Sequence, residues 1–217
     1  MITSNINSIS MVIDHQIFLE SIRFIRSHLG ANDLNYLEKK VLERLVHTSG
    51  DFSVQNLIDF SEGACEKGLQ ALKNGAPILT DTDMAAAAIK SMAENTNRNK
   101  VLTARMWFGQ NNHTKLTKTA YGLSEGWKEL SVANSGMKSP IVVIGSSPTA
   151  LTYLIDILEN AKDLPSLIIG MPVGFIGVEK SKNKLLSTDL PRIVVNSTRG
   201  GAAMAAAAVN ALLRESI

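Results

Sequence analysis

The sequence is poor in cysteine and in long apolar runs. Its 217 residues include a single cysteine, Cys65, so no internal disulfide can form. Without a CxxC pair, the chain also lacks the usual thiolate framework for a metal ion. No run of about 18 uncharged apolar residues occurs, and no basic segment followed by a long apolar one opens the chain. We therefore expect a cytoplasmic protein without a membrane span and without a protein-bound metal.

Neither sign of charge dominates. The chain has 22 Lys and Arg against 20 Asp and Glu, a formal net charge of +2. This balance argues against a nucleic-acid binder that works by bulk neutralisation of phosphates. With 45% hydrophobic residues, the chain suits one globular domain that spans residues 1–217. Any anionic ligand must then be met by local groups.

Five short apolar runs, partly β-branched, predict buried strands. They are PILT at 77–80, KVLTA at 100–104, IVVIG at 141–145, SLIIG at 166–170 and RIVVN at 192–196. Most are followed by helical patterns, which favours a parallel sheet covered by helices.

The predicted helices carry recognisable start signals. Asp33 precedes an amphipathic segment at 34–46. Ser147 and Pro148 supply a capping hydroxyl and a proline at the first helical position. Two further helices are rich in alanine, whose small side chain allows close packing against a sheet or another subunit. These alanine-rich segments are 84–95 and 202–213.

Polar loops follow four of the predicted strands. They read TDTDM, GSSPT, GMPVGFIG and NSTRGG. In open parallel sheets the ligand site lies beyond the carboxyl ends of the strands, where backbone N–H groups and helix N-termini can hold carboxylates or phosphates. Four such loops together indicate an anionic ligand, although Gly and Ser also enrich ordinary strand-to-helix loops.

No standard nucleotide or metal motif is present. The glycines of GMPVGFIG are not spaced as GxGxxG, and no glycine stands immediately before Lys180 as a P-loop requires. Asp81 and Asp83 could bind a divalent cation, but residues two apart point oppositely in an extended chain. We expect one of these two carboxylates to cap a helix instead.

His47 stands at the junction of the amphipathic helix and a Thr-Ser-Gly-Asp turn that begins at Thr48. Such a turn can fix the imidazole while leaving one nitrogen free for chemistry. A helix-end histidine favoured by the helix dipole is the alternative interpretation. The other three histidines, His15, His28 and His113, are expected to be solvated.

Several of these segments resemble the precorrin-8X methylmutase family of corrin biosynthesis, known in precorrin and cobalt-precorrin branches. The segments are ERLVHTSGDF, TDTDM, IGSSPTAL, GMPVGFIGVEKSKNKLL and TRGGAAMAAAAVNALL, and the resemblance runs from about Ile17 to Leu213. It implies a three-layer α/β/α fold with a five-stranded, mainly parallel sheet, and a homodimer.

The resemblance also implies the activity of an isomerase. The family moves a methyl group from C11 to C12 of precorrin-8X or its cobalt form, giving hydrogenobyrinic or cobyrinic acid. The family's catalytic histidine corresponds to His47. No cofactor is required for a [1,5]-sigmatropic shift, only a tetrapyrrole polycarboxylate held in its reactive tautomer. His47 is expected to donate a proton or hydrogen bond to the ring nitrogen near the migration site.

Other residues of these segments are candidates for contact with the acidic macrocycle. Arg44 lies one helical turn before His47, and Arg199 stands at the mouth of the last helix, where dipole and guanidinium act together. Surface salt bridging is the alternative for Arg44. The expected substrate-binding residues are Ser21, Arg44, Thr48, Asp81, Lys118, Ser146, Gly174, Gly177, Arg199, Gly200 and Gly201.

The chain departs from the family pattern at three positions. Phe18 replaces a tyrosine, Lys118 replaces an arginine, and Ser146 stands where asparagine is common. The first change removes a phenol. The second replaces a guanidinium, which can bind a carboxylate through two parallel hydrogen bonds, by an ammonium. These two changes support the alternative hypothesis that the protein carries the tetrapyrrole without converting it. A generic phosphate- or nucleotide-binding enzyme is the third hypothesis, which the missing fingerprints disfavour.

Overall fold

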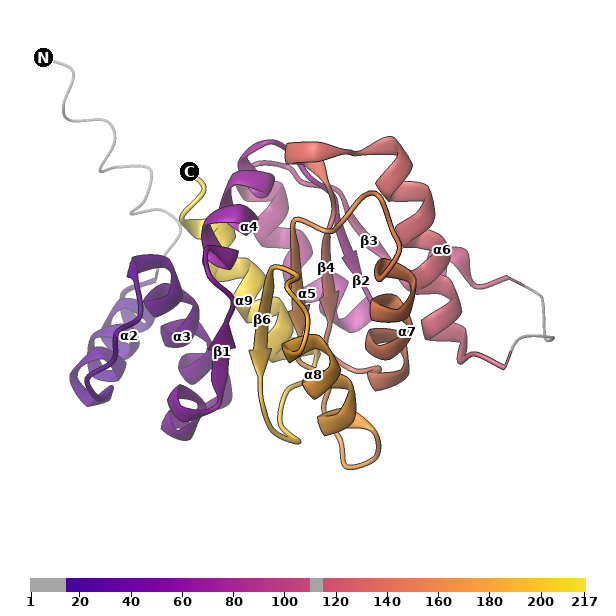
Figure 1. The fold of residues 1–217 in the computed structure, drawn as a ribbon. Helices are drawn as coiled ribbons and strands as arrows, with labels where there is room; N and C mark the ends of the chain where they lie inside the picture. Colours follow the sequence, from indigo (N-terminus) through magenta and orange to yellow (C-terminus); the bar gives the residue numbers. More distant parts are fainter. Residues whose placement is uncertain (1–14, 110–114) are drawn as a thin grey trace, which may run out of the picture.

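The structure, a computed structural model, describes residues 15–109 and 115–217. His113 therefore lies outside the described residues. A twisted sheet of six strands forms the centre, in the order β1-β6-β5-β4-β2-β3 (Figure 1). The strands are β1 (Ile58–Phe60), β2 (Ile78–Thr80), β3 (Val101–Thr103), β4 (Ile141–Ile144), β5 (Leu167–Gly170) and β6 (Arg192–Val195).

The five predicted strands are confirmed, and they run parallel. The sixth strand, β1, was not predicted. It pairs antiparallel with β6, and Ile58 lies opposite Val195 at the edge of the sheet. Three half-buried residues are too few to show a period of two in the sequence, which explains why β1 carried no signal.

Helices cover both faces of the sheet. The described α-helices are α2 (Gln16–His28), α3 (Tyr36–Ser49), α4 (Ala64–Lys73), α5 (Asp83–Asn95), α6 (Lys118–Ala133), α7 (Pro148–Leu158), α8 (Val178–Leu186) and α9 (Ala202–Arg214). Three short 3₁₀ helices are η1 (Phe52–Asn56), η2 (Ala104–Trp107) and η3 (Gly136–Lys138).

Alternate residues of each central strand enter two separate cores. Ile141 and Val143 of β4 join the core under α3, α4, α5 and α9, against which α2 packs from outside. Val142 and Ile144 join the core under α6, α7 and α8. The four residues of β4 are all buried, as a strand covered on both faces requires. The architecture is thus the three-layer α/β/α fold that the resemblance implied (Figure 1).

The helix carrying His47 has defined ends. The side chain of Asn35 accepts from the backbone N–H of Glu38, and Glu38 bonds the backbone of Asn35 in return, a capping box. The predicted start at Asp33 was therefore two residues early. The helix ends at Gly50, which adopts the left-handed conformation with φ 64° and is thereby well suited to stop it.

The predicted alanine-rich helices pack closely, as their small side chains permit. The last helix, α9, lies between α3 and α5 and also contacts β4 and β5. At its start, a Cβ on Gly145 would come within 2.7 Å of the Cα of Ala202, so β4 and α9 approach at backbone distance. The start of α7 is confirmed as well, because Ser147 caps it and Pro148 occupies its first turn.

Across the described ranges, 15–109 and 115–217, no helix has both the length and the apolar character needed to cross a bilayer.

Candidate active site

His47 lies in the last turn of α3, where α2 crosses it. Its Nδ1 is 2.9 Å from the hydroxyl of Ser21 on α2. The ring of Phe18, one turn earlier on α2, meets the imidazole edge-on, with centroids 5.2 Å apart and an interplanar angle of 81°. The imidazole is solvent-exposed. Ser21 and Phe18 thus orient the ring and leave Nε2 as the nitrogen that can meet a substrate.

The surroundings of His47 favour its neutral form. Partial burial lowers the pKa of the imidazole, and the positive charge of Arg44 lowers that pKa further. A neutral imidazole has one N–H and one acceptor nitrogen. When the hydroxyl of Ser21 donates to Nδ1, the proton resides on Nε2, which can then donate to a bound ligand.

Arg44 is packed but poorly hydrogen-bonded. Its guanidinium stands 4.6 Å from the centre of the Phe18 ring, and the guanidinium of Arg214 on α9 stands 4.8 Å from the same centre. Burial lowers the pKa of both arginines. The buried Nε of Arg44 has no hydrogen-bond partner among the described residues. Two cations around one ring attract an anion.

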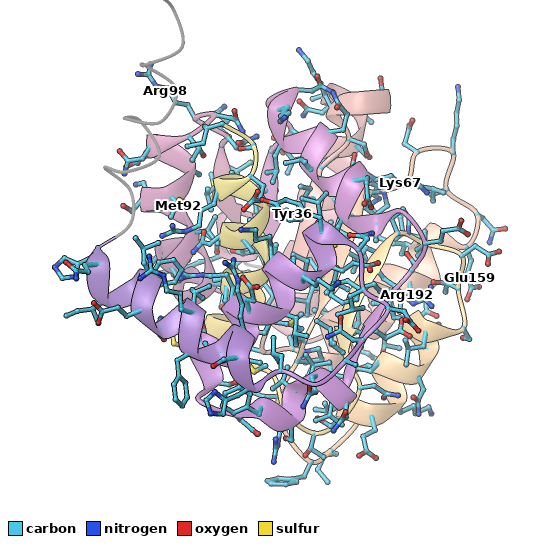
Figure 2. All side chains as sticks on the ribbon, turned by 90° about the vertical axis from the view of Figure 1, so that its left-hand side faces the viewer. Tyr36, Lys67, Met92, Arg98, Glu159 and Arg192 are labelled. Carbon is cyan, nitrogen blue, oxygen red and sulfur yellow. The ribbon has the colours of Figure 1, made fainter. Side chains whose placement is uncertain are left out.

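A cavity of about 520 Å³ opens beside these arginines, between α2, α3 and the end of α9. Phe18 lines it and also touches His47, so this ring separates the cavity from the imidazole. At the other end of the cavity, the hydroxyl of Tyr36 donates to Glu215 at 2.7 Å. Figure 2 labels Tyr36 on α3. The charged side chains that line the cavity are Arg23, Arg26, Lys40, Glu43, Arg44, Arg214 and Glu215.

The cations outnumber the carboxylates in this lining. Arg26 and Glu43 neutralise each other through two hydrogen bonds of 2.6 and 2.8 Å. Lys40 lies 3.5 Å from Glu215. The cavity therefore keeps a positive character, which suits a carboxylate group of a ligand.

At the carboxyl edge of the sheet, Asp81 is turned inward. Its carboxylate accepts the backbone N–H groups of Gly145, Ser146 and Ser147, at 3.2, 2.7 and 2.9 Å. Burial raises the pKa of Asp81, and these three bonds oppose that rise. Asp81 is 2% exposed and joins the loop after β2 to the loop after β4. Its predicted contact with a ligand is therefore not supported by its position.

Helix capping by an aspartate was also predicted for this loop, and that prediction was wrong. The hydroxyl of Thr82 caps α5. Asp83, in the first turn, accepts from the hydroxyl of Thr103 and from the guanidinium of Arg105 at 2.8 and 2.9 Å. A threonine between two aspartates was the better cap because its hydroxyl reaches the backbone N–H of Ala85.

Arg199 and the paired glycines after β6 lie at the same edge. The guanidinium of Arg199 contacts the carboxylate of Asp51 and donates to the hydroxyl of Ser53 at 2.6 Å. Because Asp51 directly follows the end of α3, this contact links the loop after β6 to the helix of His47. Gly200 adopts φ 153°, and a Cβ there would lie 2.1 Å from the carbonyl oxygen of Met171. Only glycine fits this backbone approach.

The remaining candidates are spread along the sheet. Gly174 and Gly177 have φ of 138° and 74°, so the turn itself requires them. Lys118 is exposed in the first turn of α6, after the capping residue Thr117. Figure 1 shows α6 beyond β3, at the opposite end of the sheet from α2 and α3. One chain therefore does not bring Lys118 close to His47.

The other candidate residues differ in exposure. Thr48 is exposed beside His47, whereas Ser146 is half-buried and uses its backbone N–H to bond Asp81. His15 caps α2, accepting from the N–H of Ile17, and His28 stacks on Phe24. In the described part of the chain, no three His, Cys, Asp or Glu side chains gather as a metal site would require.

Two residues near these sites were not identified from the sequence. The first is Arg214, which could not be identified because only the fold brings the end of α9 to Phe18. The second is Lys182, which is fully buried in α8. Its signal was available in the sequence, because Val178, Lys182 and Leu185 share the buried stripe of this helix. A lysine at an apolar position indicates a buried partner.

Comparisons with known proteins agree with the resemblance. The family model for precorrin-8X methylmutase matches residues 16–215. A precorrin-8X methylmutase from Pseudomonas aeruginosa is 37% identical over 204 residues, covering 92% of this chain and 94% of that protein. A cobalt-precorrin-8 methylmutase from Synechocystis sp. is 31% identical over 215 residues, with 93% and 95% covered.

The fold agrees as well. The crystal structure of a precorrin-8X methylmutase from Thermus thermophilus superposes with a TM-score of 0.80 at 29% identity, covering 92% of this chain and 95% of that one. This chain is therefore an isomerase of cobalamin biosynthesis and belongs to the precorrin-8X methylmutase family.

Proposed function

We propose that this chain moves a methyl group from C11 to C12 of precorrin-8X or of its cobalt form, with His47 as the proton partner of the macrocycle. The observation that carries this proposal is the placement of His47. Its Nδ1 is engaged by Ser21 and its ring is held by Phe18, while the imidazole is solvent-exposed. An imidazole fixed in this way presents one nitrogen in a defined direction.

The pKa of His47 defines what it does in this proposal. Because burial and Arg44 lower that pKa, the imidazole is neutral at pH 7. It then acts as a hydrogen-bond donor through Nε2 to a ring nitrogen beside the migrating methyl group, and so favours the reactive tautomer. Removing one preorganised hydrogen-bond donor from an active site typically costs about 10² to 10³ in rate. The methyl shift is intramolecular, so these residues need only bind, orient and share a proton.

Arg44 is proposed to bind a carboxylate of the substrate. Its side chain lines the cavity, and that lining carries more positive than negative side chains. A carboxylate entering there would face both Arg44 and Arg214 around the Phe18 ring. Charge-assisted hydrogen bonds in a partly buried site are stronger than those in open water, so this contact contributes mainly to substrate affinity.

We also propose a homodimer, with the active site near the interface. Phe175 and Ile176, in the loop after β5, are 89% and 90% exposed, an unusual position for large apolar side chains. Lys118 is remote from His47 within one chain, so a second copy is needed if both contact one macrocycle. Sedimentation should show a dimer at working concentrations, and Ile176→Glu should shift it toward monomer, with exposed Val132→Glu as the control. A monomer at all concentrations would contradict the dimer.

A cytoplasmic location remains part of the proposal. It is supported by the lone cysteine, Cys65, which is buried and whose pKa is raised by that burial. A thiol of this kind is unreactive and has no internal partner for a disulfide.

The test of the proposed function uses His47→Ala with the C11-methyl tetrapyrrole. The variant should still bind the corrinoid, since the arginines remain, but lose turnover by about 10² or more. His28→Ala, at an exposed histidine of α2, is the matched control and should turn over normally.

The visible spectrum separates catalysis from carriage. A change in conjugation that grows with time means conversion, whereas an immediate shift that stays constant means binding alone. Near-normal turnover by His47→Ala would remove His47 from the mechanism. Binding without conversion by the unmodified chain would support the carrier hypothesis instead.

A further inference from the structure

Lys182 on α8 is a buried lysine that the proposed chemistry does not use. Its side chain is 0% exposed. The Nζ donates to the carbonyl oxygen of Ser197 at 2.7 Å and to that of Arg199 at 2.5 Å. Burial lowers the pKa of this ammonium to about 8, although the nearby Glu179 raises it. Lysine is rarely buried to this extent unless it has a buried partner, and here the two carbonyls are those partners.

Those carbonyls belong to the loop after β6, which runs beside the loop after β5. The backbone N–H of Gly174 donates to the carbonyl of Thr198 at 3.0 Å, and that of Gly201 donates to the carbonyl of Met171 at 2.8 Å. Gly200 fits only because it has no Cβ. The two loops are thus joined by their backbones, and Lys182 bonds the loop after β6 from the side of α8.

The same loop carries Arg199. Its guanidinium reaches Asp51 and Ser53, which follow the end of α3. Lys182 therefore fixes the backbone of a residue whose side chain reaches the helix of His47. Glycines at 200 and 201 would give this backbone wide conformational freedom if its hydrogen bonds were lost, so the bonds from Lys182 help to determine where Arg199 points.

We propose that Lys182 is a positioning residue for the active site, which holds the carbonyls of Ser197 and Arg199 so that the Arg199 guanidinium stays beside the end of α3. In functional terms this rests on the proposed function and on the expectation, from the family resemblance, that Arg199 binds a carboxylate of the substrate. The structural half of the proposal stands separately, because order in the loop can be measured without substrate.

The first test measures backbone hydrogen exchange in Lys182→Met. Methionine keeps a long apolar side chain but removes the ammonium, which leaves both carbonyls without this donor. The amides of residues 197–201 should exchange about tenfold faster or more, as the loss of one or two buried hydrogen bonds predicts. Lys180→Met, at an exposed lysine of the same helix, should leave this exchange unchanged. Unchanged protection of residues 197–201 in Lys182→Met would overturn the proposal.

The second test is a double-mutant cycle with Arg199→Ala, using KM and kcat for the C11-methyl tetrapyrrole. If Lys182 acts through Arg199, Lys182→Met raises KM about tenfold in the normal chain and changes it little once Arg199 is alanine. A merely structural role predicts the same factor in both backgrounds, and that result would contradict positioning. If Arg199→Ala itself leaves KM unchanged while the loop loses protection, the positioning stands and the proposed substrate contact of Arg199 fails.

Should Lys182→Met fail to fold, Lys182→Gln serves in both tests. Its amide is one bond shorter and can donate to one of the two carbonyls, so a partial loss of protection and a smaller rise in KM are expected. Full protection together with wild-type KM in the glutamine variant would overturn the proposal.

Discussion

Asp81 and His47 both follow apolar segments and precede turns, yet the structure uses them in opposite ways. The carboxylate of Asp81 is buried and accepts three backbone N–H groups. The imidazole of His47 is exposed and bonds one hydroxyl through Nδ1. The hydrogen bonds of Asp81 join two loops of the protein, whereas His47 leaves Nε2 as a nitrogen that can bond a ligand.

The same difference separates two regions of the molecule. We call the loops that hold Asp81 and Arg199, together with Lys182 of α8, the rim, and we call the crossing of α2 and α3 around Arg44 and His47 the corner. At the rim, Asp81 and Lys182 bond backbone groups, and Arg199 pairs with Asp51. At the corner, Arg44 lines a cavity and its buried Nε has no hydrogen-bond partner among the described residues. Polar composition alone is therefore a weak sign of ligand contact.

The comparison predicts its largest effect at the rim, and on stability. Asp81→Ala removes the acceptor of three N–H groups in a buried loop, and each unsatisfied donor is costly. The free energy of unfolding should fall by about 3 kcal/mol, measured by denaturation in urea. Asp83→Ala, two residues later and exposed, should change stability little. Equal stability of Asp81→Ala and the unaltered chain would remove the rim's structural role.

The sequence predicted the frame of the molecule well. The five parallel strands are continuous apolar runs, and the start of α7 follows a Ser-Pro signal, so local chemistry determined both. The edge strand β1 was missed because three half-buried residues show no period. Asn35 rather than Asp33 caps α3, because both residue types cap well and only the reciprocal bond with Glu38 decides between them.

The site was predicted in part, and the limits are physical. His47 stood out by its place at a helix end. The inward turn of Asp81 depends on the loop after β4, which lies some sixty residues later in the chain. The cavity depends on Arg214, which only the packing of α9 brings to Phe18. Contacts of this range leave no local pattern in a sequence.

A smaller effect is expected at the corner, and on substrate affinity. Arg44→Met keeps packing against Phe18 but removes the donor, so KM should rise about tenfold while kcat changes little. Steady-state kinetics with the tetrapyrrole measure both constants. Lys39→Met, at an exposed lysine of α3, is the control. A fall in kcat with KM unchanged would instead make Arg44 part of the chemical step.

The smallest effect concerns pH. Since burial and Arg44 both lower the pKa of His47, the neutral imidazole persists below the ordinary histidine value of about 6.5. If this neutral form donates from Nε2, kcat is constant near pH 7 and falls only on the acid side of that value. In Arg44→Met one cause of the lowered pKa is gone, so this acid limb should move to higher pH. A kcat that rises on acidification would show that the imidazolium is the active form.

The most direct measurement is a structure of the chain with a bound corrinoid acid. The proposed mechanism predicts His47 Nε2 at hydrogen-bond distance, roughly 2.6–3.2 Å, from a ring nitrogen next to C11 or C12, and a carboxylate of the ligand beside Arg44. A macrocycle bound elsewhere, with His47 still facing solvent, would contradict it.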